Sequence, residues 1–221
     1  MKRVTRKLTS SMAVSMLVLS ISAPVAFVHA KEPAPEVEEE TDLSNELPIF
    51  SQNLGFYLPA GWKLAFQKLE SNMYSAEYVP AKQKLRRWKS LFCVQGYQGM
   101  ADSVSPQQFF DSFAATYKQT CQGEVYLKQL ENVQISGNNG ISALMGCTLM
   151  PNTHRSDMLK EHAHQSQPQG EMGYYTVLEG RDDLYMLHKS IRGNVFTLQS
   201  LPVNQDTWPA FIKDMKPYSL Q

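Results

Sequence analysis

The chain has 221 residues and carries 21 basic and 21 acidic side chains, so its formal net charge is zero. Without an excess of positive charge, strong attraction to nucleic acid or to anionic lipid is not expected. The sequence has no internal repeat and no second linker. The part that follows its N-terminal segments, residues 47–221, fits one domain of ordinary size.

The first thirty residues have the order of a bacterial secretory signal peptide. A basic start without acidic residues leads into an apolar stretch, Met12–Val28, and then to the small residue Ala30; the basic residues are Lys2, Arg3, Arg6 and Lys7. A retained membrane anchor is the alternative, but serines and Pro24 interrupt the run, and a spanning helix needs about 20 mainly apolar residues. We expect cleavage after Ala30, no stable membrane anchor, and a periplasmic or secreted protein.

Residues 31–46, KEPAPEVEEETDLSNE, hold seven acidic residues and one lysine. Proline and glutamate without aromatic residues bury too little apolar surface to offset chain entropy, which predicts a disordered acidic linker. Removal of the first thirty residues leaves 17 basic against 21 acidic residues, a net charge of −4. The negative charge lies in the linker, because residues 47–221 carry 16 basic and 14 acidic side chains.

Alternation with a period of two predicts three antiparallel strands early in the domain, which opens at residues 54–59. The first strand begins after Gly61 and places Trp62, Leu64 and Phe66 on one face. The second contains Tyr74, Ala76 and Tyr78, and the third runs from residue 89 to residue 97.

The period then changes to that of a helix, with an apolar stripe from Phe109 to Tyr117. Ser105 is expected to cap this helix, with Pro106 at its first position and Gln108 completing a capping box. The helix should end near Cys121.

Four more strands are predicted at residues 125–135, 141–149, 174–179 and 184–192, the first two joined by a turn at 138–140. A final helix, capped by Asp206 or Thr207, should turn its apolar residues inward; these are Trp208, Phe211, Ile212 and Met215. The order βββαββββα predicts an α+β fold, in which two helices pack on an antiparallel sheet of about seven strands.

This order and several segments resemble a family of uncharacterised exported bacterial proteins. The segments are GWKLAFQKLESNMYSAEYVP, WKSLFCVQGYQG and LEGRDDLYMLHKSIRG. Those proteins are similar in fold to PsbP, the extrinsic subunit of photosystem II, to DcrB-type envelope proteins and to Mog-type Ran-binding proteins. The resemblance covers most of residues 54–216 and implies a PsbP-like sandwich, but it implies no activity because architecture alone does not define chemistry.

Three cysteines, Cys93, Cys121 and Cys147, favour one disulfide and one remaining thiol in an exported protein. The resemblance implies a Cys121–Cys147 bridge, because the family places one cysteine at the end of the first helix and another in the strand after the hairpin. Cys93 would then be a small buried hydrophobe outside the bridge. A Cys93–Cys147 bridge between neighbouring strands remains the alternative.

Histidines in the long polar stretch 151–171 are weak candidates for metal ligands, together with Asp157 and Glu161; they are His154, His162 and His164. On a helix, His162 and His164 would point to different faces. The spacing therefore favours a polar surface loop, and no metal site is expected.

The one dense basic run, residues 82–89, contains the candidate partner-binding residues Lys84, Arg86, Arg87 and Trp88. Such a run with one aromatic residue can dock on phosphate, on an acidic protein or on anionic headgroups. The alternative is a solvated connection whose Trp88 turns inward at the start of the next strand. The family resemblance favours that alternative.

No nucleophile elbow, phosphate loop, HExxH or CxxC motif occurs in the sequence. The pattern therefore favours a non-enzymatic binding or accessory protein of the envelope or the medium. It would need no cofactor, and its partner would be an unidentified protein or small ligand. The alternatives are a secreted hydrolase or metal-dependent enzyme with a dispersed site, or a secreted effector.

Overall fold

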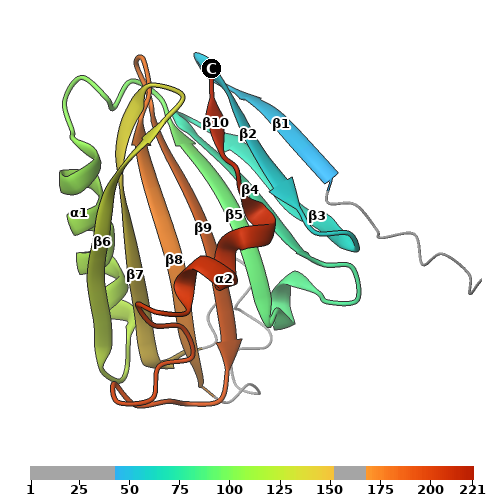
Figure 1. Cartoon of the computed structure of the whole chain (residues 1–221), viewed down its shortest axis with the longest axis vertical. Helices are drawn as coiled ribbons and strands as arrows, with labels where there is room; N and C mark the ends of the chain where they lie inside the picture. The colour runs from blue at the N-terminus through green and yellow to red at the C-terminus, as the bar shows by residue number, and fades with distance from the viewer. Residues whose placement is uncertain (1–42, 152–167) are drawn as a thin grey trace, which may run out of the picture. The chain divides into compact units, whose positions relative to one another are not determined.

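Seven of the strands form one antiparallel sheet, as the alternation in the sequence predicts (Figure 1). In the computed structural model, which describes residues 43–151 and 168–221, the order across this sheet is β3-β4-β5-β9-β8-β7-β6. The bounds are β3 (Trp62–Glu70), β4 (Met73–Pro80), β5 (Ser90–Tyr97), β6 (Val125–Ile135), β7 (Asn138–Met150), β8 (Gln169–Glu179) and β9 (Leu184–Gly193). The predicted signal peptide, residues 31–42 of the linker and the histidines of the polar stretch lie outside the described residues.

Helix α1 (Pro106–Thr120) covers one face of this sheet. Its N-terminus has the predicted capping box, because the Ser105 side chain accepts from the Gln108 N–H and the Gln108 side chain accepts from the Ser105 N–H. Phe109 and Phe110 pack against β7, β8 and β9 in one buried cluster. The α+β class and the first helix are therefore confirmed.

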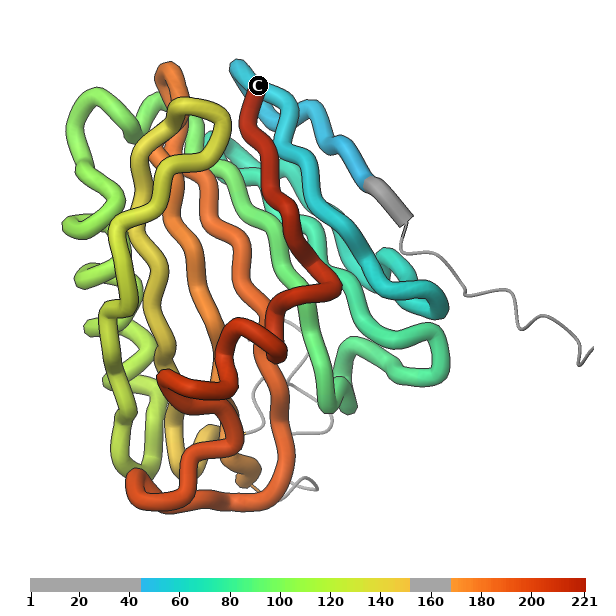
Figure 2. The backbone as a smooth tube through the Cα atoms, in the orientation of Figure 1, coloured from blue at the N-terminus to red at the C-terminus, as the bar shows by residue number. Residues whose placement is uncertain are grey.

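A second, three-stranded sheet covers the opposite face, and the sequence did not predict it. Its order is β1-β2-β10, with β1 (Leu43–Ile49), β2 (Gln52–Leu58) and β10 (Ser219–Leu220). Figure 2 shows the C-terminal segment beside β2. The two faces are distinguished by successive residues of β9, since Met186 packs with α1 and Leu187 packs under the small sheet.

The predicted linker boundary at residue 46 is too late, because β1 begins at Leu43. Every residue of β1 pairs with β2 across a turn at Phe50, which adopts a positive φ of 53°. The segment LSNELPI has no regular alternation, so its strand depends on this pairing and on the burial of Ile49.

The β6–β7 hairpin turns at Ser136 and Gly137, two residues before the predicted turn. Both residues have positive φ, 52° and 84°, as a tight two-residue hairpin turn requires. The Asn138 side chain donates to the backbone oxygen of Leu220 at 3.0 Å. This asparagine therefore ties the hairpin to β10.

The C-terminal helix is shorter than predicted and is split into α2 (Trp208–Ile212) and the 3₁₀ turn η3 (Lys213–Met215). Its N-cap residue is Thr207, but no side chain caps it. Ile212 and Met215 are buried, as expected, whereas Trp208 and Phe211 are only partly buried. Among the helices of the described residues, none is long and apolar enough to cross a membrane.

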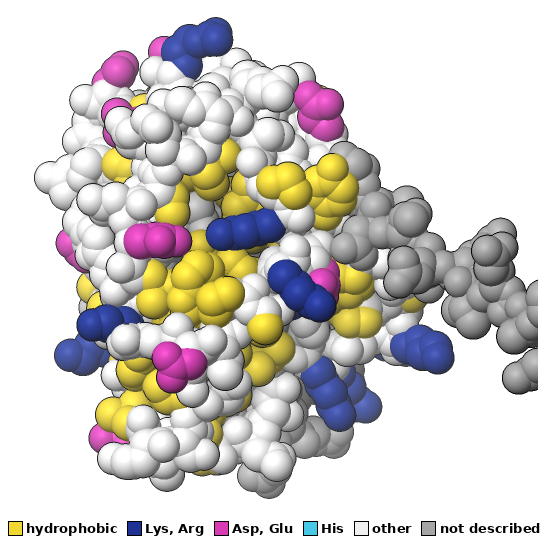
Figure 3. All heavy atoms as spheres, viewed as in Figure 1, with side chains coloured by type: hydrophobic (Ala, Val, Ile, Leu, Met, Phe, Trp, Pro, Cys, Tyr) yellow, Lys and Arg dark blue, Asp and Glu magenta, His cyan; other side chains and the backbone are white. Residues whose placement is uncertain are grey.

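Apolar side chains gather in the middle of the face that carries α2 and β10 (Figure 3). Lys216 lies over this region, with Nζ 5.4 Å from the centroid of the Trp208 ring and 5.6 Å from that of Tyr174. Burial lowers the pKa of Lys216. These contacts hold the segment before β10 against the sheet.

The predicted disulfide joins Cys121, the C-cap residue of α1, to Cys147 of β7, with a Cα–Cα distance of 5.7 Å. Cys93 of β5 is not part of the bridge and is 2% exposed. The pairing that the family resemblance implied is therefore confirmed, and the Cys93–Cys147 alternative is wrong.

Asp183 in the β8–β9 turn is buried, although acidic side chains of a tight turn are expected to face water. Its carboxylate accepts hydrogen bonds from the Ser51 N–H and hydroxyl at 3.0 and 2.6 Å, and from the Gly99 N–H at 2.8 Å. Tyr185 donates a further bond at 3.2 Å. Although burial acts to raise the pKa of Asp183, these bonds outweigh it and lower the pKa. Asp183 thus links its own β8–β9 turn to the β1–β2 turn, through Ser51, and to the segment after β5, through Gly99.

We expect Asp183→Asn to lower the free energy of unfolding at pH 7 by about 2 kcal/mol, because an amide cannot accept these bonds as a carboxylate does. An unfolded aspartate takes up its proton near pH 3.9, and native Asp183 does so at lower pH. The wild-type advantage is therefore complete above pH 3.9 and is lost as the pH falls through the native pKa. Urea unfolding from pH 7 to pH 2.5 measures it, with the exposed Asp182→Asn as the control.

Candidate functional site

The predicted basic run forms a short connection between β4 and β5, built around the 3₁₀ turn η1 (Leu85–Arg87). The Gln83 side chain accepts hydrogen bonds from the N–H groups of Lys89, at 2.6 Å, and Ser90, at 3.2 Å. The Arg87 N–H donates to the Lys84 oxygen at 2.9 Å. These bonds fix the turn, and its three cationic side chains, Lys84, Arg86 and Arg87, are exposed.

Trp88 points inward and is 4% exposed, in a cluster with Val79 and Leu91. It is therefore not available to a partner, and the candidate role for its ring is wrong. The inward-facing alternative holds, because the ring has an apolar site at the start of β5. Leu85 packs against the same cluster and anchors the turn from within.

A buried ion pair connects Trp88 to helix α1. The Arg192 guanidinium lies 4.4 Å from the centroid of the Trp88 ring and forms an ion pair with Glu171. The side chains of Arg192 and Glu171 are 9% and 8% exposed. The Tyr117 hydroxyl of α1 donates to Glu171 at 3.3 Å, and burial raises the pKa of Tyr117. These contacts hold the Trp88 ring in place, and Trp88 directly follows the basic turn.

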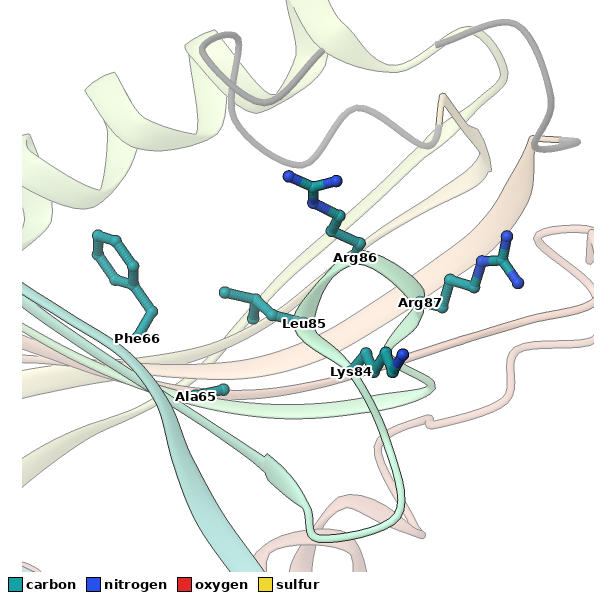
Figure 4. A pocket seen from close by; sticks show the side chains of 6 residues that line it. All are labelled: Ala65, Phe66, Lys84, Leu85, Arg86 and Arg87. Atoms are coloured by element: carbon teal, nitrogen blue, oxygen red, sulfur yellow. The ribbon is translucent and has the colours of Figure 1, made fainter. Parts of the chain in front are cut away.

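Above the turn lies a hollow of about 740 Å³ (Figure 4). Its lining combines apolar and cationic side chains: Ala65, Phe66, Lys84, Leu85, Arg86 and Arg87. Figure 4 shows Phe66 on one side of the space and the turn with Leu85 and Arg86 on the other. The hollow therefore lies between edge strand β3 and the basic turn.

A β-bulge brings Phe66 to the hollow. Leu64 pairs with Tyr78 but Phe66 pairs with Glu77, so Ala65 is the extra residue. Paired residues share a face of the sheet, so the bulge puts Leu64 and Phe66 on opposite faces. The prediction that both face the same side is wrong for this reason, and nothing in the alternation reveals the bulge.

The lining residues define what the hollow can bind. Guanidinium and ammonium groups only donate hydrogen bonds, and they attract anions. The apolar floor favours a group with hydrocarbon or aromatic surface. The described lining residues thus suit an anionic group joined to an apolar one.

On the same face of the sheet as Phe66, register places Glu77, Cys93, His188 and Tyr175 in one cross-strand row that continues from Phe66. The His188 ring stacks on Tyr175 at 4.9 Å, and its Nδ1 lies 3.2 Å from the Ser190 hydroxyl oxygen. A thiol beside an imidazole can be a nucleophile. Cys93, however, is 2% exposed, so a substrate cannot reach this thiol in the described conformation.

Within residues 43–151 and 168–221, no group of three or more histidine, cysteine or acidic side chains can hold a metal ion. The candidate ligands His154, His162 and His164 lie outside those ranges. The expectation that this chain has no metal site therefore remains a prediction.

The fold and the hollow together define an α+β sandwich with a basic hollow at one sheet edge. No protein family model and no curated protein sequence matches the chain. Among solved structures it is similar to PsbP of the cyanobacterium Synechocystis, with 11% identity over 82% of this chain and 91% of that one and a TM-score of 0.42. It is also similar to the Saccharomyces cerevisiae Ran-binding protein Mog1p, with 9% identity, coverages of 80% and 86%, and a TM-score of 0.40. Likeness at this level carries no information on function.

Proposed function

We propose that this protein is a non-enzymatic binding or accessory protein of the bacterial envelope or the medium, and that it holds an anionic group of its partner in the basic hollow. One observation carries the proposal: three cationic side chains project from a single anchored turn beside an apolar floor. Surface lysines are usually scattered among acidic residues, whereas the described lining here includes no carboxylate.

Two features support a location outside the cytoplasm. The N-terminal thirty residues have the pattern of a secretory signal. The Cys121–Cys147 disulfide is typical of proteins that fold in an oxidising compartment.

An enzyme is the second candidate, as a secreted hydrolase or metal-dependent enzyme with a dispersed site. The register that pairs Cys93 with His188 on neighbouring strands is the feature that would favour it. The binding function is better supported, because the described lining of the open hollow contains cations that donate hydrogen bonds, and no carboxylate or imidazole that could act as a general base. Burial keeps Cys93 from any substrate.

Phenyl phosphate joins an anionic group to an aromatic ring, and we expect it to bind in the hollow. In an NMR titration it should shift the amide resonances of residues 65–66 and 84–87. The double variant Arg86→Glu/Arg87→Glu should weaken this binding by about tenfold or more, because reversal of two charges replaces attraction with repulsion.

Arg181→Glu is the matched control, since Arg181 is an exposed arginine in the β8–β9 turn. It should leave the affinity within about twofold. Phenol and inorganic phosphate, each with half of the probe's chemistry, should bind more weakly. Shifts that centre elsewhere, or that survive the double charge reversal, would contradict the proposed function.

A further inference from the structure

Strand β3 forms one edge of the seven-stranded sheet, and no strand of the described chain pairs with its outer side. An edge strand presents backbone N–H and C=O groups to which another extended chain can add. At nine residues, β3 is long enough for several such bonds. The hollow of the proposed function adjoins this edge, because Ala65 and Phe66 belong to both.

One face of this edge is apolar. Leu64 and Leu69 pair with Tyr78 and Tyr74 and therefore lie on the face that carries the small sheet. They are 47% and 64% exposed. Of the five exposed large hydrophobic side chains of the described residues, three lie in the β3–β4 hairpin. The third, Met73 at 37%, pairs with Glu70 and therefore lies on the opposite face. Such grouping marks a contact surface better than scattered residues do.

The other face of the same edge is cationic. Phe66, Lys68 and Glu70 pair with Glu77, Ser75 and Met73, and so lie on the face opposite Leu64 and Leu69. Lys68 and Glu70 form an ion pair there, so the net positive charge of this face comes from the basic turn. On that face the hollow adds Lys84, Arg86 and Arg87. Because of the bulge at Ala65, Leu64 shares the apolar side of the edge with Leu69, whereas Phe66 lies on the basic side.

We infer that β3 binds an extended segment of a partner protein in which apolar and acidic residues alternate, and that this segment adds to the sheet as an eighth strand. Side chains of a strand point alternately to its two faces, so one set would meet Leu64 and Leu69 and the other the basic hollow. This inference rests on the proposed function and names its partner class.

A second copy of this chain fits the edge poorly. Antiparallel pairing of two β3 strands keeps like faces together, and would bring both sets of Lys84, Arg86 and Arg87 to one side of the joined sheet. Like charges in such a pairing are destabilising. Charge complementarity therefore selects an acidic partner.

A synthetic nine-residue peptide of alternating valine and glutamate tests the inference. Residues two apart in a strand direct their N–H groups to the same edge, so N-methylation of all valines or of all glutamates blocks one edge at a time. By calorimetry, one of the two methylated peptides should bind about tenfold or more weaker than the parent, and the other within about twofold. The parent peptide should also slow hydrogen exchange of β3 amides.

Two variants of the protein test the two faces separately. Leu64→Ser/Leu69→Ser should weaken binding of the parent peptide at least about fivefold, with Leu127→Ser as the matched control. Leu127 is 49% exposed on β6, the opposite edge strand. Arg86→Glu/Arg87→Glu should weaken it at least as much.

Equal affinities of the two methylated peptides, or self-association through β3, would overturn strand addition. If phenyl phosphate still binds the hollow in that case, only the present inference fails. If charge reversal alters neither phenyl phosphate nor peptide binding, the proposed function fails as well.

Discussion

Loss of the disulfide should lower the free energy of unfolding by about 3.5 kcal/mol, whichever cysteine is replaced. The bridge closes a loop with a sequence separation of 26, and a closed loop of that length removes about this much conformational freedom from the unfolded chain. Cys121→Ser and Cys147→Ser should therefore be equally destabilising, and the double variant should cost little more than either. Urea unfolding with and without reductant measures all three.

Cys93→Ser serves as the control because it leaves the bridge intact. Its cost should come from a hydroxyl in an apolar site and should not depend on reductant. Single variants that differ by more than about 1.5 kcal/mol would mean that local packing, and not loop closure, dominates the effect.

Arg192→Met should lower the free energy of unfolding by about 3–5 kcal/mol, at least as much as loss of the disulfide does. The variant leaves the Glu171 carboxylate buried without its ion pair. The double variant Arg192→Met/Glu171→Met removes both charges and should recover much of the loss. With Glu171→Met as the second single variant, chemical denaturation of the wild type and the three variants forms a double-mutant cycle.

Arg181→Met, at an exposed arginine, should change stability by less than about 0.5 kcal/mol. Arg192→Met should also disturb the basic turn, because the guanidinium supports Trp88. A double variant as unstable as Arg192→Met alone would show that the ion pair itself is not the source of the cost.

The large sheet and α1 could be predicted because their signals are local. Alternation defines the strands, and Ser105 with Gln108 defines the start of the helix. The small sheet could not, because β1 has no alternation and β10 has only two residues. Both depend on pairing with β2, which joins segments from opposite ends of the described chain.

Only part of the candidate site could be predicted from the sequence. The basic residues stand together in the sequence, and the inward turn of Trp88 was one of its two interpretations. The floor of the hollow was not predictable, because Phe66 reaches it through a bulge that shifts β3 relative to β4. A shift of one residue reverses which face a side chain occupies, and it leaves no mark in the order of apolar residues.

The pairing of β10 with β2 also affects how the chain folds. Gln221 and Asn53 exchange backbone hydrogen bonds of 3.0 and 2.8 Å, and Leu220 is 1% exposed in the cluster with Leu54 and Phe56. The same cluster contains Met215 and Tyr218, so it is complete only when residues 215–220 have been synthesised. Contacts between such distant segments raise the mean sequence separation of contacting residues, which favours slow folding, in milliseconds or longer.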